Sequence, residues 1–264
     1  MLFVSVSGSS RSRSALVRSF LRLAQTGNVP RTITPGHHDG WGIALYRAGQ
    51  IIEWYRSGES GFSDIGRDQI LSDIDEKRPD TLLVHVRKMT AGEPAERNSH
   101  PFVDGKFAFI HNGMLGSPDQ EIFKDVNKRA VGETDTERYF HLIIHELESE
   151  NTHDPKHVAD VFAKTVRALR AGASYAGGSF TSASSILTDG RYAYVLREFT
   201  EEHPLVKRYA AESYYTLYLG RGDDGTLVVC SERLDIPGVV WKLLPNHTLT
   251  TIDLDSRNVR TNCV

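Results

Sequence analysis

The stretch HVRKMTAGEPAERNSHPFVDGKFAFIHNG, residues 85–113, opens at the end of one apolar run, residues 81–84, and closes on a second, residues 107–110. Both runs are predicted to be buried strands. Polar groups at the ends of buried strands are costly to desolvate unless they bind something. We therefore expect the two strands to deliver a set of polar residues to one site. The set consists of Arg87, Thr90, His111, Asn112 and Gly113.

The rest of the chain predicts an α+β protein in which helices cover the sheets, because the elements do not alternate as βαβ units. Strands are predicted at 1–6, 41–46, 51–55, 214–219, 227–230, 239–244 and 249–254, with a hairpin at Asp189-Gly190. Helices are predicted from Ser9 or Ser10 to Gly27 and at 64–77, 134–148 and 155–170, with a further helix start at 117–120. No low-complexity linker divides the chain, so we expect a single domain over residues 1–264.

Composition excludes several classes of protein. A formal charge of −3, from 31 basic and 34 acidic residues, gives no electrostatic signature of nucleic-acid binding. No apolar run reaches the roughly 18 residues that a membrane helix needs. Two cysteines form neither a disulfide framework nor a metal cluster, and the N-terminus does not resemble a signal peptide, so we expect a cytoplasmic protein.

Four segments occur in order along the chain: HVRKMTAG (85–92), NSHPF (98–102), HNG (111–113) and ETDTE (133–137). Together they resemble the class II glutamine amidotransferase domain, and HHDGWGIA (37–44) resembles its stand-alone branch, which includes γ-glutamyl amide hydrolases. The resemblance covers most of the chain and is strongest over residues 37–147. It implies the four-layer αββα sandwich of the Ntn hydrolases, with two mostly antiparallel sheets between helices.

The resemblance also implies roles for individual residues. Arg87 matches the arginine that binds the α-carboxylate of the glutamyl substrate, and Asp135 matches the acid that holds its α-ammonium group. Thr90 and His100 match positions that line the pocket near that end. The side-chain amide of Asn112 and the backbone N–H of Gly113 match the oxyanion hole. Residues 39–42 match a segment to which we assign only a structural role.

The nucleophile departs from the family pattern. In the family it is a cysteine left as residue one after removal of Met, with its own α-amino group as the base. Here position 2 is Leu2, and neither Cys230 nor Cys263 can supply a free α-amine. Either the protein has lost the cysteine, or the natural chain begins upstream of Met1 and the run from Met1 continues a Met-Cys-Arg opening.

Other interpretations of the same residues stay open at this point. Arg87 and Asp135 could form a structural ion pair, and Asn112-Gly113 could be only a hairpin turn. His100 fits a core histidine and a pocket residue equally well, whereas His111 fits a hydrogen-bonded core histidine better. The pairs His141/His145 and His37/His38 are weak candidates for metal ligands, because no H-E-x-x-H pattern is present.

Two functions are consistent with these features. The first is hydrolysis of the γ-amide of glutamine or of a γ-glutamyl compound through a thioester, with no metal and no organic cofactor. Ammonia would then be released or passed to a partner subunit. The second is a catalytically inactive homologue that binds a glutamyl ligand or a partner protein.

Overall fold

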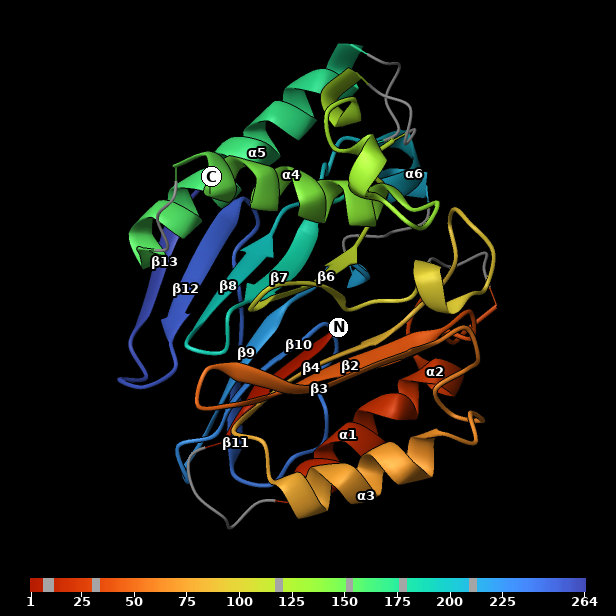
Figure 1. Ribbon diagram of the computed structural model, residues 1–264, viewed down its shortest axis with the longest axis vertical. Helices are drawn as coiled ribbons and strands as arrows, with labels where there is room; N and C mark the ends of the chain where they lie inside the picture. Colours follow the sequence, from red (N-terminus) through yellow and green to blue (C-terminus); the bar gives the residue numbers. More distant parts are fainter. Residues whose placement is uncertain (7–11, 30–33, 117–120, 151–153, 176–179, 209–212) are drawn as a thin grey trace.

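The computed structural model describes residues 1–6, 12–29, 34–116, 121–150, 154–175, 180–208 and 213–264. Two sheets lie face to face, and every strand pairing recorded within each sheet is antiparallel. Helices cover the outer face of each sheet (Figure 1). The predicted αββα sandwich is therefore confirmed.

The first sheet has the strand order β11-β9-β10-β1-β4-β2-β3. Its strands are β1 (Leu2–Ser5), β2 (Trp41–Arg47), β3 (Gln50–Ser57), β4 (Thr81–Val86), β9 (Tyr218–Gly222), β10 (Leu227–Cys230) and β11 (Val239–Leu243). Its outer face is covered by α1 (Arg13–Leu21), α2 (Leu23–Thr26) and α3 (Arg67–Lys77).

The second sheet has the order β13-β12-β8-β7-β6-β5. Its strands are β5 (Phe102–Asp104), β6 (Phe107–Asn112), β7 (Ser184–Thr188), β8 (Tyr192–Arg197), β12 (Thr248–Asp253) and β13 (Val259–Cys263). The helices α4 (Asp135–Glu150) and α5 (Pro155–Tyr175) cover it, and α6 (Pro204–Arg208) follows β8. Single 3-10 turns occur at η1 (Glu96–Asn98), η2 (Glu121–Phe123) and η3 (Asn127–Arg129).

Three layers of apolar side chains hold the sandwich together. The alternation along β1 shows how they form, because successive side chains of a strand point to opposite faces. Leu2 and Val4 pack toward α1 and α3, whereas Phe3 packs between the two sheets with Ile110 and Ile186. A third layer joins α4 and α5 to the second sheet. All residues of β1 are buried, as the sequence predicts for this run.

The structure corrects several element boundaries. The side chain of Ser12 caps the N-terminus of α1 by accepting the N–H of Ala15. The observed cap is therefore Ser12 and not Ser9 or Ser10, which lie outside the described residues. The predicted helix at 64–77 begins only at Arg67, and Ile65, which lies inside the predicted range, is 98% exposed. The helix start predicted at 117–120 also lies outside the described residues.

The strand predictions need two corrections. The strand expected at 214–219 begins only at Tyr218, so Tyr214 and Tyr215 belong to the segment that precedes β9. The strands β5 and β13 were not predicted, because one is short and the other is polar and mostly exposed. The turns at Ala48-Gly49 and Asp189-Gly190 are confirmed, and both glycines have a positive φ.

Asp64 ties the start of β2 to the approach to α3. One carboxylate oxygen accepts the indole N–H of the buried Trp41 at 2.7 Å and the hydroxyl of Tyr55 at 3.0 Å. The other accepts the N–H of Gly66 at 2.7 Å. Burial by itself raises the pKa of Asp64, but these hydrogen bonds and one from Ser57 outweigh it and lower the pKa below 3.8. Trp41 is thus a packing anchor, as predicted.

We predict that Asp64→Ala lowers the free energy of unfolding by about 1–3 kcal/mol, because the buried indole N–H loses its acceptor. Since the pKa of Asp64 is lowered in the folded state, its contribution is complete above pH 3.8 and is lost as the pH falls further. Urea unfolding at pH 7 and below pH 3.8 checks both points.

The matched control is Asp255→Ala, because the Asp255 side chain is 79% exposed and its ion pair with Arg191 is long, at 3.8 Å. We expect this change to stay within about 0.5 kcal/mol of the wild type. Equal losses for the two variants would contradict the anchoring role of Asp64.

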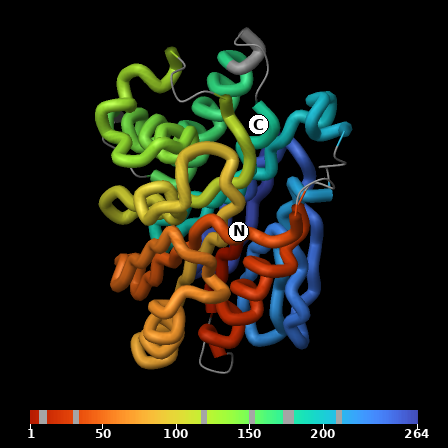
Figure 2. Tube along the Cα trace, turned by 90° about the vertical axis from the view of Figure 1, so that its right-hand side faces the viewer, coloured from red at the N-terminus to blue at the C-terminus, as the bar shows by residue number. Residues whose placement is uncertain are grey.

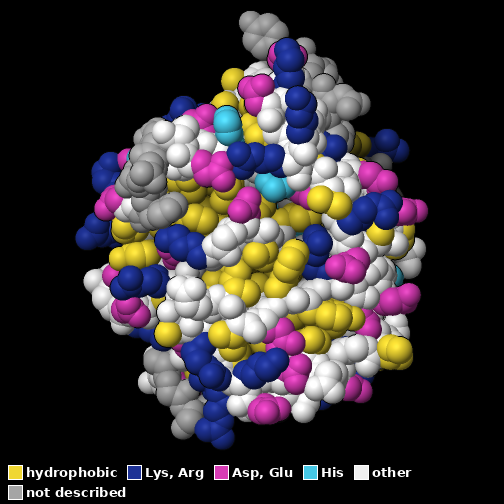
Figure 3. All heavy atoms as spheres, viewed as in Figure 1, with side chains coloured by type: hydrophobic (Ala, Val, Ile, Leu, Met, Phe, Trp, Pro, Cys, Tyr) yellow, Lys and Arg dark blue, Asp and Glu magenta, His cyan; other side chains and the backbone are white. Residues whose placement is uncertain are grey.

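The surface carries mixed charge. On the face drawn in Figure 3, the described Lys and Arg side chains alternate with Asp and Glu, in keeping with a formal net charge of −3. Within the described ranges, none of the helices combines the length and the apolar character needed to cross a membrane.

Candidate functional site

Strand ends from both sheets meet at one cavity. Because β1 is antiparallel to β4 and to β10, the start of β1 lies beside the ends of those two strands. The end of β6, from the other sheet, reaches the same place, and the chain's first residue lies near the middle of the molecule (Figures 1 and 2). The cavity has a volume of about 370 Å³.

All six predicted site residues line this cavity. They come from the end of β4, the loop that follows it, the end of β6 and the start of α4. The six are Arg87, Thr90, His100, Asn112, Gly113 and Asp135. The expectation that the two apolar strands deliver their polar residues to one place is confirmed, although the strands belong to different sheets.

Arg87 is 4% exposed and is held by backbone carbonyls. Its Nη2 donates to the carbonyl oxygens of Ala91 at 2.5 Å and Gly92 at 3.4 Å, and its Nη1 donates to those of Asp39 at 3.1 Å and Glu93 at 3.2 Å. Burial lowers the pKa of Arg87, and nearby carboxylates oppose this shift. The guanidinium remains charged and is fixed in orientation at the cavity wall.

Asp135 stands at the first turn of α4 and is 6% exposed. One of its carboxylate oxygens accepts the N–H of Leu115 at 2.7 Å. The start of a helix favours a negative charge. Neither Arg87 nor Asp135 is bonded to the other, so the interpretation of the two as a structural ion pair is wrong. Both charges instead face the same cavity.

Asn112 and Gly113 end β6 where it approaches the segment before β7. Gly113 has a φ of +150°, and a Cβ added there would lie 2.0 Å from the carbonyl oxygen of Ser182. Only glycine fits this backbone. The interpretation of the pair as a simple hairpin turn is wrong, because β6 pairs with β7, more than 60 residues away in sequence.

Three histidines form the cavity floor, and each is buried. His111 donates or accepts at both ring nitrogens, with the hydroxyl of Thr136 and the carbonyl of Ser182 each at 2.9 Å, so its prediction as a hydrogen-bonded core histidine is confirmed. His100 Nδ1 lies 3.0 Å from His85 Nδ1. Burial is the main cause that lowers the pKa of His85 and His100 well below 6.5, so both rings are neutral. His100 is both a core and a cavity residue.

The N-terminal amine lies in this cavity. The α-amino nitrogen of Met1 donates to Ser231 Oγ at 3.1 Å, and the N–H of Ser231 donates to the carbonyl of Met1 at 3.1 Å. Burial lowers the pKa of this amine below 8.0. Cys230, remote in sequence, pairs with Leu2 across the β1–β10 ladder. Burial raises the pKa of its thiol to about 11, so it is not a ready nucleophile.

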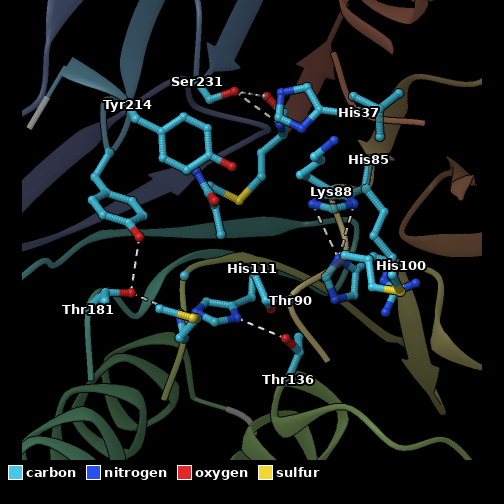
Figure 4. Close-up of a pocket in the computed structure, with 18 of the residues that line it drawn as sticks. His37, His85, Lys88, Thr90, His100, His111, Thr136, Thr181, Tyr214 and Ser231 are labelled. Atoms are coloured by element: carbon cyan, nitrogen blue, oxygen red, sulfur yellow. Dashed lines mark hydrogen bonds between the residues drawn. The ribbon is translucent and has the colours of Figure 1, made fainter. Parts of the chain in front are cut away.

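A further group of cavity residues was not predicted. Ser231 and Glu232 follow β10 directly, and the end-of-strand position that singled out Arg87 could have found them. Tyr214 and Tyr215 lie in an irregular segment that carried no signal, and His37 was considered only as a metal ligand. Figure 4 shows His37, Tyr214 and Ser231 on the side of the cavity opposite Thr136.

The structure offers little for a metal. His141 Nε2 lies 4.0 Å from a Glu137 carboxylate oxygen. In the described part of the chain, no group of three or more His, Cys, Asp or Glu side chains is arranged to hold a metal ion.

Solved structures of other proteins share this architecture. A class II glutamine aminotransferase domain protein from Silicibacter pomeroyi superposes with a TM-score of 0.62 at 23% identity, over 84% of this chain and 90% of that one. The glutamine phosphoribosylpyrophosphate amidotransferase from B. subtilis gives a TM-score of 0.62 at 13% identity, over 99% of this chain and 48% of that one. The fold is that of the Ntn-type amidotransferases.

Sequence comparison gives the family. The profile of the class II glutamine amidotransferases matches residues 10–217, so the chain belongs to that family. The Escherichia coli (strain K12) protein YafJ, which carries the name of a glutamine amidotransferase, is 32% identical over 66% of this chain and 64% of its own length. A Shewanella oneidensis glutamine–fructose-6-phosphate aminotransferase is 31% identical over 44% of this chain, which corresponds to only 19% of that protein.

We predict that Gly113→Ala destabilises the protein by about 1–3 kcal/mol, because the new methyl group meets the Ser182 carbonyl and the backbone conformation is strained. The control is Gly172→Ala in α5, where an added Cβ meets nothing within 4 Å. There the helix propensity of alanine should stabilise by up to about 1 kcal/mol. Thermal unfolding of both variants checks the pair, and an undisturbed Gly113→Ala protein would contradict this geometry.

Proposed function

We propose that this protein is an amidohydrolase of the glutamine amidotransferase type, which cleaves the γ-amide of glutamine or of a γ-glutamyl compound. The nucleophile would be a cysteine located just upstream of Met1 in the natural chain. The observation that carries the proposal is that Met1, Arg87, Asn112 and Asp135 line one cavity. The residue that begins β1, two opposite charges and an amide donor are thereby brought together.

The two charges suit an amino-acid end. Arg87 would bind the α-carboxylate and Asp135 the α-ammonium group, since a fixed guanidinium and a helix-start carboxylate match those charges. The backbone carbonyls around Arg87 hold it in place before substrate binds, which lowers the ordering cost of binding. Thr90 and His100 would lie beside this end of the substrate.

The Asn112 amide and the Gly113 N–H would stabilise the oxyanion of the tetrahedral intermediate. Such donors act best when they are fixed in advance, and losing one typically costs about 10²–10³ in rate. The close approach of Gly113 to Ser182 supports this role, because it fixes the backbone that carries the N–H.

The β1–β10 pairing indicates where a nucleophile upstream of Met1 would lie. Leu2 lies opposite Cys230 and Met1 is bonded to Ser231, so a preceding residue would enter the cavity beside Glu232. The thiol would attack the γ-carbonyl, and the terminal amine would take its proton.

The second candidate is a catalytically inactive homologue that binds a glutamyl ligand or a partner protein. It is favoured by Leu2 at the second position and by the high pKa of the Cys230 thiol, about 11. N-terminal sequencing of the protein from its natural source separates the two candidates. A first-position cysteine, with glutamate released from glutamine, supports the hydrolase, whereas a start at Met1 or Leu2 with no release supports the inactive homologue.

The remaining expectations stay predictions. No cofactor is required by the proposed chemistry. The ammonia could be released or passed to a partner subunit, as the relationship to larger aminotransferases suggests. A single domain over residues 1–264 and a cytoplasmic location are likewise proposals.

We predict that Arg87→Ala weakens glutamine binding about 30-fold or more. The variant removes the cation that would pair with the α-carboxylate of glutamine, and truncating one member of a buried charge pair costs roughly 2 kcal/mol or more of binding free energy. Isothermal calorimetry measures the affinity, and thermal unfolding reports any collapse of the loop that Arg87 supports. The hydrolase requires this loss, and so does an inactive homologue that binds a glutamyl ligand, whereas a homologue that binds only a partner protein does not.

The matched control is Arg97→Ala, which removes ion pairs to Glu93 and Glu133 on the same loop without touching the cavity. Its glutamine affinity should stay within about twofold of the wild type, because exposed ion pairs contribute little. An unchanged affinity of Arg87→Ala for glutamine would show that Arg87 does not bind the α-carboxylate.

A further inference from the structure

The cavity is larger than free glutamine needs. Its volume of about 370 Å³ falls in the range of roughly 300–1,000 Å³ that holds drug-sized ligands, and glutamine is much smaller than such ligands. Asp135 is near enough to Arg87 to act on its pKa, and Asp135 directly precedes Thr136, which lies opposite His37 and Tyr214 in Figure 4, so the two charges that suit an α-amino acid lie toward one end. The other end leaves room for a further part of a larger substrate.

The second end is continuous with the oxyanion hole. Met114 follows Gly113, and its N–H donates to Thr181 Oγ1 at 3.0 Å. The hydroxyl of Tyr215 donates to the same Thr181 oxygen at 3.0 Å, and the ring of Tyr215 packs on that of Tyr214 at a centroid distance of 5.1 Å. A substrate carbonyl at Gly113 would therefore direct its amine part toward the two tyrosines.

This end is lined mainly by aromatic and apolar side chains, with the ammonium group of Lys88 near His37, where it would repel a second cation. The ring of His37 lies parallel to that of Tyr214, with an interplanar angle of 11° and centroids 6.2 Å apart (Figure 4). Burial lowers the pKa of His37 to about 4, so the ring is uncharged at neutral pH. Leu205 and Val206 from α6 complete the wall.

The carboxylate nearest this end already has partners. Glu232 accepts the backbone N–H of Asn28 at 2.9 Å with one oxygen and its side-chain amide at 2.8 Å with the other. Burial raises the pKa of Glu232. An ammonium group on the substrate would have to compete with these bonds, whereas an apolar group would need no ionic partner.

We propose that the site takes γ-glutamyl amides whose amine part is an apolar alkyl or aromatic group, and that His37, Tyr214, Tyr215, Leu205 and Val206 bind this part. The inference rests on the proposed function and extends it to a substrate class. The C–N bond of the amide breaks, the amine leaves with the proton taken from the thiol, and water then releases glutamate from the thioester. The products are glutamate and the free apolar amine.

The test uses protein from its natural source and three substrates. They are L-glutamine, γ-L-glutamyl-pentylamide and γ-L-glutamyl-(4-aminobutyl)amide, of which the last two have the same length and differ in a terminal methyl or ammonium group. We expect kcat/KM for the pentylamide to exceed that for the aminobutyl compound and that for glutamine by about 10-fold or more, the discrimination an apolar pocket gives.

Variants at Tyr214 test whether its ring causes the preference for the pentylamide. Tyr214→Ala should reduce the ratio of kcat/KM for pentylamide over glutamine by about fivefold or more, whereas Tyr214→Phe, which keeps the ring, should preserve it. Phe62→Ala, an aromatic side chain that is 40% exposed and outside the cavity, should leave the ratio unchanged.

Failure of this inference is distinguishable from failure of the proposed function. Turnover of glutamine with no preference for the pentylamide, or a preference for the ammonium compound, overturns the apolar substrate class and leaves the amidohydrolase standing. No turnover of any of the three substrates overturns the amidohydrolase itself. A ratio that falls equally in Tyr214→Ala and Phe62→Ala overturns the assignment of the binding wall.

Discussion

The pairing of β1 with β4 on one side and with β10 on the other is the constraint on which the rest of the structure depends. All four residues of β1 are buried, so the strand has no position except in the middle of its sheet. Antiparallel pairing on both sides then fixes the chain's first residue beside Arg87 and Ser231. The position of Met1 is thus a consequence of strand register rather than of local sequence.

The same register buries polar side chains at the site, and each of them costs free energy of folding unless it is hydrogen-bonded. Arg87, His85 and His100 are all buried, and buried polar groups are tolerated only when they are hydrogen-bonded. Arg87 meets this condition through four carbonyls, whereas His100 leaves its Nε2 without a partner among the described residues. The site therefore contains a buried ring nitrogen that makes no hydrogen bond with a described residue, and such atoms are common in functional sites.

The sequence predicted the site where polar residues follow strong apolar periodicity or belong to a recognisable motif. Arg87, Asn112 and Asp135 are such residues, and the cavity contains all three. Ile65 was misassigned because Asp64 binds the N–H of Gly66 and so delays the helix start, a tertiary effect that periodicity does not carry. Tyr214 was misassigned to a strand, because an alternating aromatic pattern does not reveal that the ladder begins only at Tyr218.

The two ends of the cavity differ in how the chain builds them. The charged end comes from residues 85–135, whose positions are set by two buried strands and one helix start, so small changes in sequence there would disturb the fold as well as the chemistry. The aromatic end comes mainly from α6 and the segment before β9, where Val206, Tyr214 and Tyr215 form a small cluster with Phe199, which follows β8, outside the three main core layers. Because this cluster is separate from the three main core layers, we expect the αββα sandwich to tolerate substitutions in it. The proposed binding of the glutamyl group thus depends on residues that the core fixes in place, whereas the proposed binding of the amine depends on residues outside the three main core layers.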